Sequence, residues 1–401
     1  MAREKSEKVD KISDNEKTIM SLFGGEEQSV FLNGDINCVA NMDVISTGSS
    51  TLDYALGVGG IPRGRIIQLA GKESSGKTLL SFMIVKSWLD KDPENTAMFI
   101  DAEYTYDPKW VKQLGVDTSR VIVVRINEAK KIFDGLLGKM KENKITKKVT
   151  KGVNGVLDLV IEGQEKKFKK LGVIIVDSLA AINTPMEIAA EVGKQNMSPI
   201  SRFLSTELKK LTPAVAKANV AMIFINQVRV NIGQMHGDPE TTSGGKALKH
   251  ACSVMIQTAA SQSKDNSIFD KNENMIGHTV NVKVTKNKVG PPFRKAKYKI
   301  EYNKGIVNKA EELLDIACAL NIIERPNLRS YIYGEEKLTS REQAIDFLSI
   351  QSNYDEIEKK CRDLYLSGAE AKIEVEEEDD SDDMNDFIST EQDSESEEES
   401  E

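Results

Sequence analysis

Short runs of β-branched and apolar residues recur along most of the chain and predict a series of buried strands. Most of these runs precede a longer stretch with helical spacing of its apolar residues, and strands that alternate with helices form parallel sheets covered on both faces. Two later runs, 278–285 and 296–302, predict an antiparallel pair. The pattern predicts an α/β core over 44–307, with parallel strands at 65–70, 97–100, 121–126, 172–176, 220–225 and 254–258.

The pattern changes at both ends of this core. Residues 1–27 are polar and helix-prone, and we predict that residues 1–43 form a short N-terminal helical segment. Residues 308–372 have amphipathic helical spacing and predict a small, α-rich C-terminal domain. The tail, 373–401, holds 16 acidic residues and no Lys or Arg, so it cannot bury an apolar face and is expected to be disordered.

Charge is distributed unevenly between this tail and the rest of the chain. The whole sequence has 63 acidic and 54 basic residues and a net charge of −9. Without the tail, residues 1–372 have 47 acidic and 54 basic residues, so this body carries +7. The asymmetry excludes a uniformly acidic protein. Two accounts of the tail remain open: it competes with duplex DNA for the basic body, or it only increases solubility.

The composition excludes several other classes of protein. Four Cys lie far apart without a C-x-x-C pair, and there are only three His, which disfavours a disulfide framework, a zinc site and a His-rich metal centre. The N-terminus lacks the apolar segment of a signal peptide, and no apolar run reaches 18 residues. We therefore expect a soluble, cytoplasmic protein with no membrane partner.

One Lys-rich segment, 139–170, interrupts the alternation of strands and helices. It holds ten Lys and four acidic residues, and its apolar stretch 153–161 predicts a hairpin strand. We interpret the segment as a surface insertion. A solvated charged loop and an auxiliary patch that contacts DNA both remain open as accounts of it.

The strand at 65–70 leads into a phosphate-binding motif. Residues 71–78 read Gly-Lys-Glu-Ser-Ser-Gly-Lys-Thr, the P-loop pattern G-x-x-x-x-G-K-[ST], and a helical stretch follows. Backbone N–H groups of such a loop turn inward around phosphates, and the helix N-terminus adds partial positive charge. Lys77 is expected to reach the β- and γ-phosphate oxygens, and the Thr78 hydroxyl to bind Mg²⁺.

Two later strands end in acidic residues, at the edge where an open α/β sheet carries its chemistry. Asp177 follows 172–176 and is the candidate Walker B carboxylate for Mg²⁺. Glu103 follows 97–100 and is the candidate base that orients the attacking water. Either acid alone is also compatible with a helix N-cap, but the P-loop favours the catalytic interpretation.

Long blocks of the sequence resemble the RecA family of recombinases, in the family's order. The resemblance covers roughly 15–370, and the insertion 139–170 departs from it. It implies a RecA-type P-loop ATPase core with a mostly parallel central sheet flanked by helices, an N-terminal helix for oligomerisation and a small C-terminal domain. The matching blocks are 46–78, 99–117, 173–182, 224–249 and 284–306.

The resemblance implies ATP and Mg²⁺ as cofactors and assigns residues to them. Glu103 would be the catalytic carboxylate, and Thr78 and Asp177 would hold the metal. Asp107 and Trp110 would meet the adenine, although the family usually has Tyr in place of Trp110, and Tyr302 would be a second aromatic side chain near the base. The nucleotide-binding loop would comprise Gly71, Lys72, Glu73, Ser74, Ser75, Gly76, Lys77, Thr78 and Leu79.

Three further residues would link hydrolysis to the state of the assembly. Gln227 matches the family's γ-phosphate sensor at the end of a strand. Lys286 and Lys288 resemble lysines that reach ATP bound by a neighbouring subunit. Two cations supplied in this way would stabilise transition-state charge, as an arginine finger does, so hydrolysis would require assembly.

The resemblance also implies two DNA-binding loops, at about 191–200 and at 228–243, the second expected to lack regular structure. Met197 would wedge into the path of the DNA backbone, and His236 stands where many relatives have Phe. The helix after the first loop would present Arg202 and its neighbours on one face. A second helix, after the second loop, would offer free N–H groups to a DNA phosphate. The expected DNA-binding residues are Met197, Arg202, Ser205, Lys209, Arg229, Ile232, Thr242, Gly244, Gly245 and Lys246.

The resemblance predicts an ATP-dependent recombinase that polymerises on single-stranded DNA as a helical filament and exchanges strands with double-stranded DNA in recombinational repair. Its DNA-binding residues suit backbone contacts, and sequence would be read by base pairing. Two alternatives remain, a hexameric P-loop helicase or translocase and a non-catalytic recombination mediator. The lysine pair favours the recombinase over the motor, and the presence of Lys77 and Glu103 disfavours the mediator.

Overall fold

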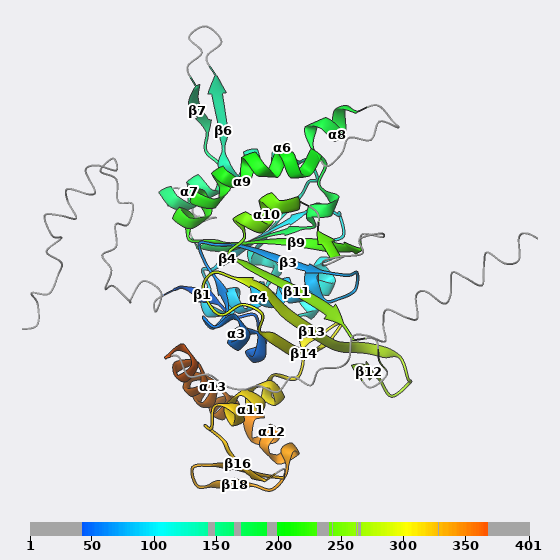
Figure 1. The fold of residues 1–401 in the computed structure, drawn as a ribbon, viewed down its shortest axis with the longest axis vertical. Helices are drawn as coiled ribbons and strands as arrows, with labels where there is room; N and C mark the ends of the chain where they lie inside the picture. The colour runs from blue at the N-terminus through cyan, green and yellow to red at the C-terminus, as the bar shows by residue number, and fades with distance from the viewer. Residues whose placement is uncertain are drawn as a thin grey trace, which may run out of the picture. The chain divides into compact units, whose positions relative to one another are not determined.

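A computed structural model describes residues 42–142, 149–163, 170–190, 199–230, 240–242, 244–261, 263, 266–327 and 329–367 (Figure 1). The predicted N-terminal segment up to residue 41 and the acidic tail lie outside these residues. Among the residues that are described, no helix is both long enough and apolar enough to cross a membrane.

The architecture is α/β, as predicted, with one large sheet at its centre. Its strands run in the order β15–β14–β13–β11–β3–β9–β8–β4–β5, and those from β11 to β5 are parallel. The later strands β13, β14 and β15 pair antiparallel, which confirms the second prediction. The bounds are β3 Ile66–Gly71, β4 Thr96–Asp101, β5 Val121–Arg125, β8 Leu171–Asp177, β9 Ala221–Val230, β11 Val254–Ala260, β13 Met275–Asn287, β14 Lys295–Glu301 and β15 Gly305–Ile306.

Successive residues of the parallel strands point to opposite faces, and both faces are buried. In β3, Ile67 packs on one face of the sheet and Ile66 on the other. In β8, Ile175 and Ile174 likewise pack on opposite faces of the sheet. The side chains of these four isoleucines are at most 1% exposed. Strands buried on both sides read as continuous apolar runs, which is why the sequence revealed them.

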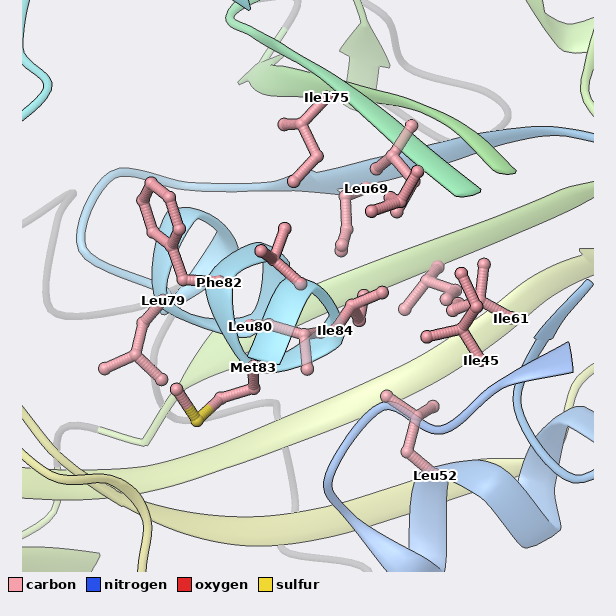
Figure 2. Close-up of a cluster of buried hydrophobic side chains, with 14 of the residues drawn as sticks. Ile45, Leu52, Ile61, Leu69, Leu79, Leu80, Phe82, Met83, Ile84 and Ile175 are labelled. Carbon is pink, nitrogen blue, oxygen red and sulfur yellow. The ribbon is translucent and has the colours of Figure 1, made fainter. Parts of the chain in front are cut away.

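Helices cover each face. On one face, α4 (Lys77–Lys91) contributes side chains such as Phe82 and Met83 to the cluster shown in Figure 2. On the other face lie α6, α9 and α10 (Figure 1). Their bounds, with those of the other helices and short strands of the core, are α3 Ser50–Leu56, α5 Pro108–Gln113, η1 Thr118–Arg120, α6 Ala129–Leu137, η3 Leu179–Ala181, α8 Pro185–Ala189, α9 Pro199–Ala218, α10 Gly245–Ala251, β1 Val44–Ile45, β2 Ile61–Pro62, β10 Glu240–Thr242 and β12 Ser267–Phe269.

The Lys-rich insertion contains a two-stranded ribbon and a helix. Strand β6 (Lys139–Glu142) pairs antiparallel with β7 (Val149–Val153). The apolar stretch at 153–161, predicted to be a strand, is mostly the helix α7 (Val156–Glu162), so that prediction was wrong. The Asp158 carboxylate accepts a hydrogen bond from the Gly155 N–H at 3.0 Å, and Leu157 is buried. This local cap, together with packing on one side only, explains the helix.

The C-terminal region contains a small sheet in addition to its helices. Helices α11 (Lys309–Ala319), α12 (Arg341–Ser349) and α13 (Gln351–Leu366) share an apolar cluster. Between α11 and α12 lies an antiparallel sheet, in a domain that was predicted to be α-rich from its amphipathic helical spacing. The Tyr-Ile-Tyr run at 331–333, followed by Gly334, was the sequence signal for a strand in this sheet. The strands are β16 Glu324–Asn327, β17 Ser330–Tyr333 and β18 Glu336–Leu338.

A buried carboxyl group joins this region to the core. The Glu312 side chain of α11 accepts hydrogen bonds from the Ser49 hydroxyl at 2.5 Å and from the Thr51 N–H at 3.1 Å, at the start of α3. Burial raises the pKa of Glu312 to about 7, and these hydrogen bonds oppose that rise. The bonds therefore attach α11 to the first turn of α3.

Candidate nucleotide site and DNA-binding surface

The P-loop connects β3 to α4 and is fixed by a close approach to β11. A Cβ atom added to Gly71 would lie 2.4 Å from the Thr258 carbonyl oxygen, so only glycine fits at that position. The Ser75 hydroxyl donates to the Lys72 carbonyl oxygen at 2.8 Å and lies 2.9 Å from the Thr258 hydroxyl. Gly76, with φ of 80°, directly precedes the first residue of α4. The loop therefore has a defined shape at the helix N-terminus.

Lys77 lies folded against this loop. Its ammonium donates to the Lys72 carbonyl oxygen and to the Ser75 hydroxyl, the latter at 3.3 Å. Burial lowers the pKa of Lys77, and the negative charges of Asp177, Glu103 and Glu73 oppose this effect. A desolvated cation interacts strongly with an anion that enters the loop, whereas the nearby carboxylates oppose that anion.

Thr78 and Asp177 meet where Mg²⁺ was predicted. The Thr78 hydroxyl donates to the Asp177 carboxylate at 2.8 Å. Burial raises the pKa of Asp177 to about 6, Glu103 adds to the rise, and Thr78 and Lys77 oppose it. A hydroxyl and a desolvated carboxylate are oxygen ligands that suit Mg²⁺, and a bound cation would favour the ionised acid. The residues present therefore fit the metal.

Glu103 lies beside these groups and is held by a residue that the sequence reasoning did not select. The Ser178 hydroxyl donates to the Glu103 carboxylate. Asp101, which is fully buried, accepts from the Thr105 N–H at 3.0 Å and from the Tyr106 N–H at 3.1 Å, and so shapes the turn that carries Glu103. One indication of this role was present in the sequence, because Ser178 directly follows the predicted metal ligand Asp177.

The two aromatic residues predicted for the adenine lie together. The Trp110 indole N–H donates to the Tyr302 carbonyl oxygen at 2.7 Å. Trp110 also packs edge-on against Phe82 of α4, with ring centroids 5.7 Å apart. Asp107 caps α5 by accepting from the Lys109 N–H at 2.8 Å. The indole thus contacts both the helix that begins at the P-loop and the backbone of Tyr302.

Gln227 lies next to the P-loop across the sheet. In the parallel pairing of β3 with β9, Gln227 is the register partner of Gly71. Strand β9 continues past Gln227 into the second predicted DNA loop. The ends of that loop pair as antiparallel strands, with Val228 opposite Thr242 and Arg229 opposite Thr241, where no regular structure was expected.

Lys286 and Lys288 contact the end of α10 within the chain. Lys286 donates to the Lys249 carbonyl oxygen, and Lys288 donates to the His250 carbonyl oxygen at 3.2 Å. These carbonyl groups belong to the last turn of a helix, where cations are stabilised. In one chain the lysine pair therefore caps α10, and its predicted contact with a neighbouring subunit's nucleotide stays a prediction.

The predicted DNA-binding side chains of α9 share an exposed face. Arg202, Ser205 and Lys209 are all exposed, and the Ser205 hydroxyl donates to the Arg202 carbonyl oxygen at 2.7 Å. The start of α10 lies against the same helix, since a Cβ added to Gly245 would be 2.9 Å from the Ser201 hydroxyl oxygen. The structure thus brings two predicted DNA-binding elements together.

Three relatives match this chain over most of its length. The Protein RecA of Wolbachia sp. subsp. Drosophila simulans (strain wRi) is 39% identical over 330 residues, 82% of this chain and 83% of the relative. That of Ehrlichia canis (strain Jake) is 38% identical over 335 residues, 83% and 84% of the two chains. That of Anaplasma marginale (strain Florida) is 39% identical over 325 residues, 80% of each.

A family model, the RecA N-terminal domain, matches residues 11–145 and 147–307. The chain belongs to the RecA family. Membership confirms the resemblance drawn from the sequence blocks, and the α/β fold agrees with it. This family model ends at residue 307, the end of the predicted core.

Some residues predicted for this RecA-family chain remain outside the structural description. Met197, Ile232 and His236 lie outside the described residues, as do most residues of both loops. Arg229 and Thr242 lie on described strands, but their side chains are not described. Gly244 and Lys246 lie at the start of α10, where Lys246 is exposed.

Proposed function

We propose that the protein is an ATP-dependent DNA recombinase, which polymerises on single-stranded DNA and catalyses homologous pairing and strand exchange in recombinational repair in the cytoplasm. One observation carries the proposal: β9 places Gln227 opposite Gly71 of the P-loop and then runs into the second predicted DNA loop. A change at the γ-phosphate that Gln227 senses would therefore pass along β9 into the loop that would bind DNA.

The residues of the site would divide the hydrolysis between them. Bound Mg²⁺ neutralises phosphate charge, and Thr78 and Asp177 would hold it. Lys77 would exchange its hydrogen bond to the Lys72 carbonyl oxygen for the phosphate oxygens. Glu103, oriented by the Ser178 hydroxyl, would orient the attacking water and accept its proton.

Assembly would complete the site. We propose that Lys286 and Lys288 leave the end of α10 and reach the nucleotide of the adjacent subunit, where they stabilise transition-state charge. Because α10 begins after the second predicted DNA loop and the lysines bond to its last turn, DNA binding at that loop would favour release of the lysines. Hydrolysis would therefore depend on both DNA and neighbours.

DNA would be held through its backbone. Arg202 and Lys209 on α9 and Lys246 on α10 are exposed cations suited to phosphates, and Met197 and Ile232 would supply apolar contacts. We further propose that residues 1–43 mediate polymerisation, that 44–307 form the ATPase and DNA-binding core, that 308–372 form a separate domain and that the acidic tail, 373–401, competes with duplex DNA.

Electron microscopy with single-stranded DNA, Mg²⁺ and ATP tests the proposed assembly. Helical filaments that require nucleotide, together with strand exchange on a homologous duplex, are the expected result. Closed rings that unwind or translocate along DNA would instead indicate the motor alternative. Filaments with no ATP hydrolysis would indicate the mediator.

A mixing experiment tests the shared active site. The double variant Lys286→Ala, Lys288→Ala is expected to bind ATP but to lose DNA-stimulated hydrolysis, and Lys77→Ala is expected to lose hydrolysis as well. At a mixed interface, the first variant supplies an intact P-loop and the second supplies intact lysines. Activity should therefore recover in mixtures. No recovery at any ratio would argue against sharing.

A further inference from the structure

The β6–β7 ribbon concentrates positive charge in a short stretch of chain. Its two strands, 139–142 and 149–153, include three Lys and one acidic residue, Glu142. One carboxylate can offset only one of these lysines, so at least two positive charges remain without a counter-charge within the two strands. On the adjacent α6, Lys131 pairs with Glu128 at 2.5 Å.

The base of the ribbon is fixed to the helical layer. A Cβ added to Gly138 would lie 2.4 Å from the Val153 carbonyl oxygen, and one added to Gly155 would lie 2.2 Å from the Gly138 nitrogen. The two ends of the ribbon therefore touch backbone to backbone. Leu157, which follows at once in α7, is 1% exposed in the cluster that α6 and α9 share. The ribbon thus leaves the core at a defined place.

The base of the ribbon lies away from the start of α9, which follows the first predicted DNA loop. Helix α7 packs against α9, and Figure 1 shows α7 near the end of α9 from which the chain enters β9. The first loop lies at the opposite end of α9, before Pro199. A helix of 20 residues is about 30 Å long, so the base of the ribbon and Pro199, the first residue of α9, lie toward opposite ends of a long helix.

We propose that the β6–β7 ribbon is an additional DNA-binding element that contacts the phosphate backbone of double-stranded DNA, apart from the strand held at the loops. The inference rests on the proposed recombinase function. Duplex DNA carries about one negative charge per 1.7 Å of helix axis, and its major groove admits a two-stranded β-ribbon. Lysines contact phosphates without reading bases, so this binding is independent of sequence.

Two variants with the same change in net charge test the ribbon. The first replaces its strand lysines, Lys139→Gln, Lys141→Gln and Lys151→Gln. The control replaces three exposed lysines elsewhere, Lys271→Gln, Lys337→Gln and Lys359→Gln. Affinity for a fluorescent duplex is measured across a salt series, on filaments formed with single-stranded DNA, ATP and Mg²⁺.

The ribbon variant should bind the duplex more weakly at low salt, and its log–log salt slope should be smaller than that of wild type by up to about 2.7, or about 0.9 per lost contact. The control should match wild type, and all three proteins should show equal ATP hydrolysis with single strands. Equal slopes for wild type and ribbon variant, or equal losses in both variants, would overturn the proposal.

Site-specific cross-linking gives a readout that does not depend on lost affinity. A photoreactive residue at position 141 should cross-link to the duplex, whereas one at position 337 should not. Absence of the first cross-link would also overturn the proposal. If the wild-type protein bound single strands and hydrolysed ATP, the proposed recombinase function would stand without the cross-link. A wild-type protein that neither bound single strands nor hydrolysed ATP would overturn both the recombinase function and the proposal for the ribbon.

Discussion

Two charged side chains at the nucleotide site, Lys77 and Asp177, are buried, whereas those on the exposed face of α9 point into solvent. Lys77 is 8% exposed and Asp177 is 5% exposed, and burial shifts the pKa of both in the direction of the neutral form. Arg202 and Lys209 are exposed. A charge in a low-dielectric site interacts strongly with a single partner. An exposed charge is screened by water and salt, so binding through exposed charges depends on how many of them make contacts.

Lys77→Ala should have the largest effect, a loss of ATP hydrolysis at the nucleotide site. The substitution removes the only lysine of the loop that is buried among the acids, so ATP hydrolysis should fall to background at every salt concentration. Phosphate release with saturating single-stranded DNA measures it. Hydrolysis near the wild-type rate would contradict the P-loop assignment.

Glu103→Gln should retain nucleotide binding and lose turnover, because the amide cannot accept a proton. A positioned general base contributes roughly 10²–10⁴-fold, and the loss should be of that size. Filaments of the variant on DNA should be long-lived. Ser178→Ala should show a smaller loss with unchanged ATP affinity, since Ser178 only orients Glu103. Unchanged turnover in Glu103→Gln would place the base elsewhere.

Asp177→Asn should stabilise the nucleotide-free protein at neutral pH. The pKa of Asp177 rises from 3.8 in the unfolded chain to about 6 in the fold, so ionised Asp177 costs stability above that range. The gain at pH 7 should reach at most about 3 kcal/mol and should vanish below about pH 4, where both forms are neutral. Thermal unfolding from pH 4 to pH 8 measures it.

A matched control for this pH series is Asp346→Asn, which changes an exposed acid on α12. Its melting temperature should follow that of wild type at every pH. A gain in Asp177→Asn that is constant with pH would show that ionisation of Asp177 is not its cause.

Arg202→Ala should have the smallest effect, a modest loss of affinity for DNA. Loss of one phosphate contact should weaken single-strand binding by less than about tenfold and reduce the salt slope by about 0.7. Thermal stability should change by no more than about 0.5 kcal/mol. Lys359→Ala, an exposed change on α13, is the control. Equal slopes for Arg202→Ala and wild type would argue that this helix face does not touch DNA.

Much of the fold could be predicted because its signals are local. Each buried parallel strand is a continuous apolar run, and the P-loop carries its own spacing. The strand predicted at 153–161 failed because one apolar stretch fits a helix or a strand equally well, and the Asp158 cap with one-sided burial of Leu157 decided for α7. The sheet at 324–338 was missed among amphipathic helices for the same reason.

The candidate site divides in a similar way. Lys77, Thr78, Glu103 and Asp177 could be named from motifs, because phosphate and Mg²⁺ chemistry demands those residue types at strand ends. The bond from Ser178 to Glu103 could not be inferred in the same way, because a hydroxyl gains its role only from what it faces. The same is true of the lysines that cap α10.

The sequence by itself determined the class of fold, the phosphate loop, the acidic residues beside it and the uneven distribution of charge. These properties follow from residue type and spacing along the chain. Only the tertiary structure decided that Gln227 lies opposite Gly71, that α10 begins against α9 and that the Lys-rich ribbon leaves the core at α7. These depend on strand order and helix packing, which bring together residues far apart in the chain and so fix which charges are buried.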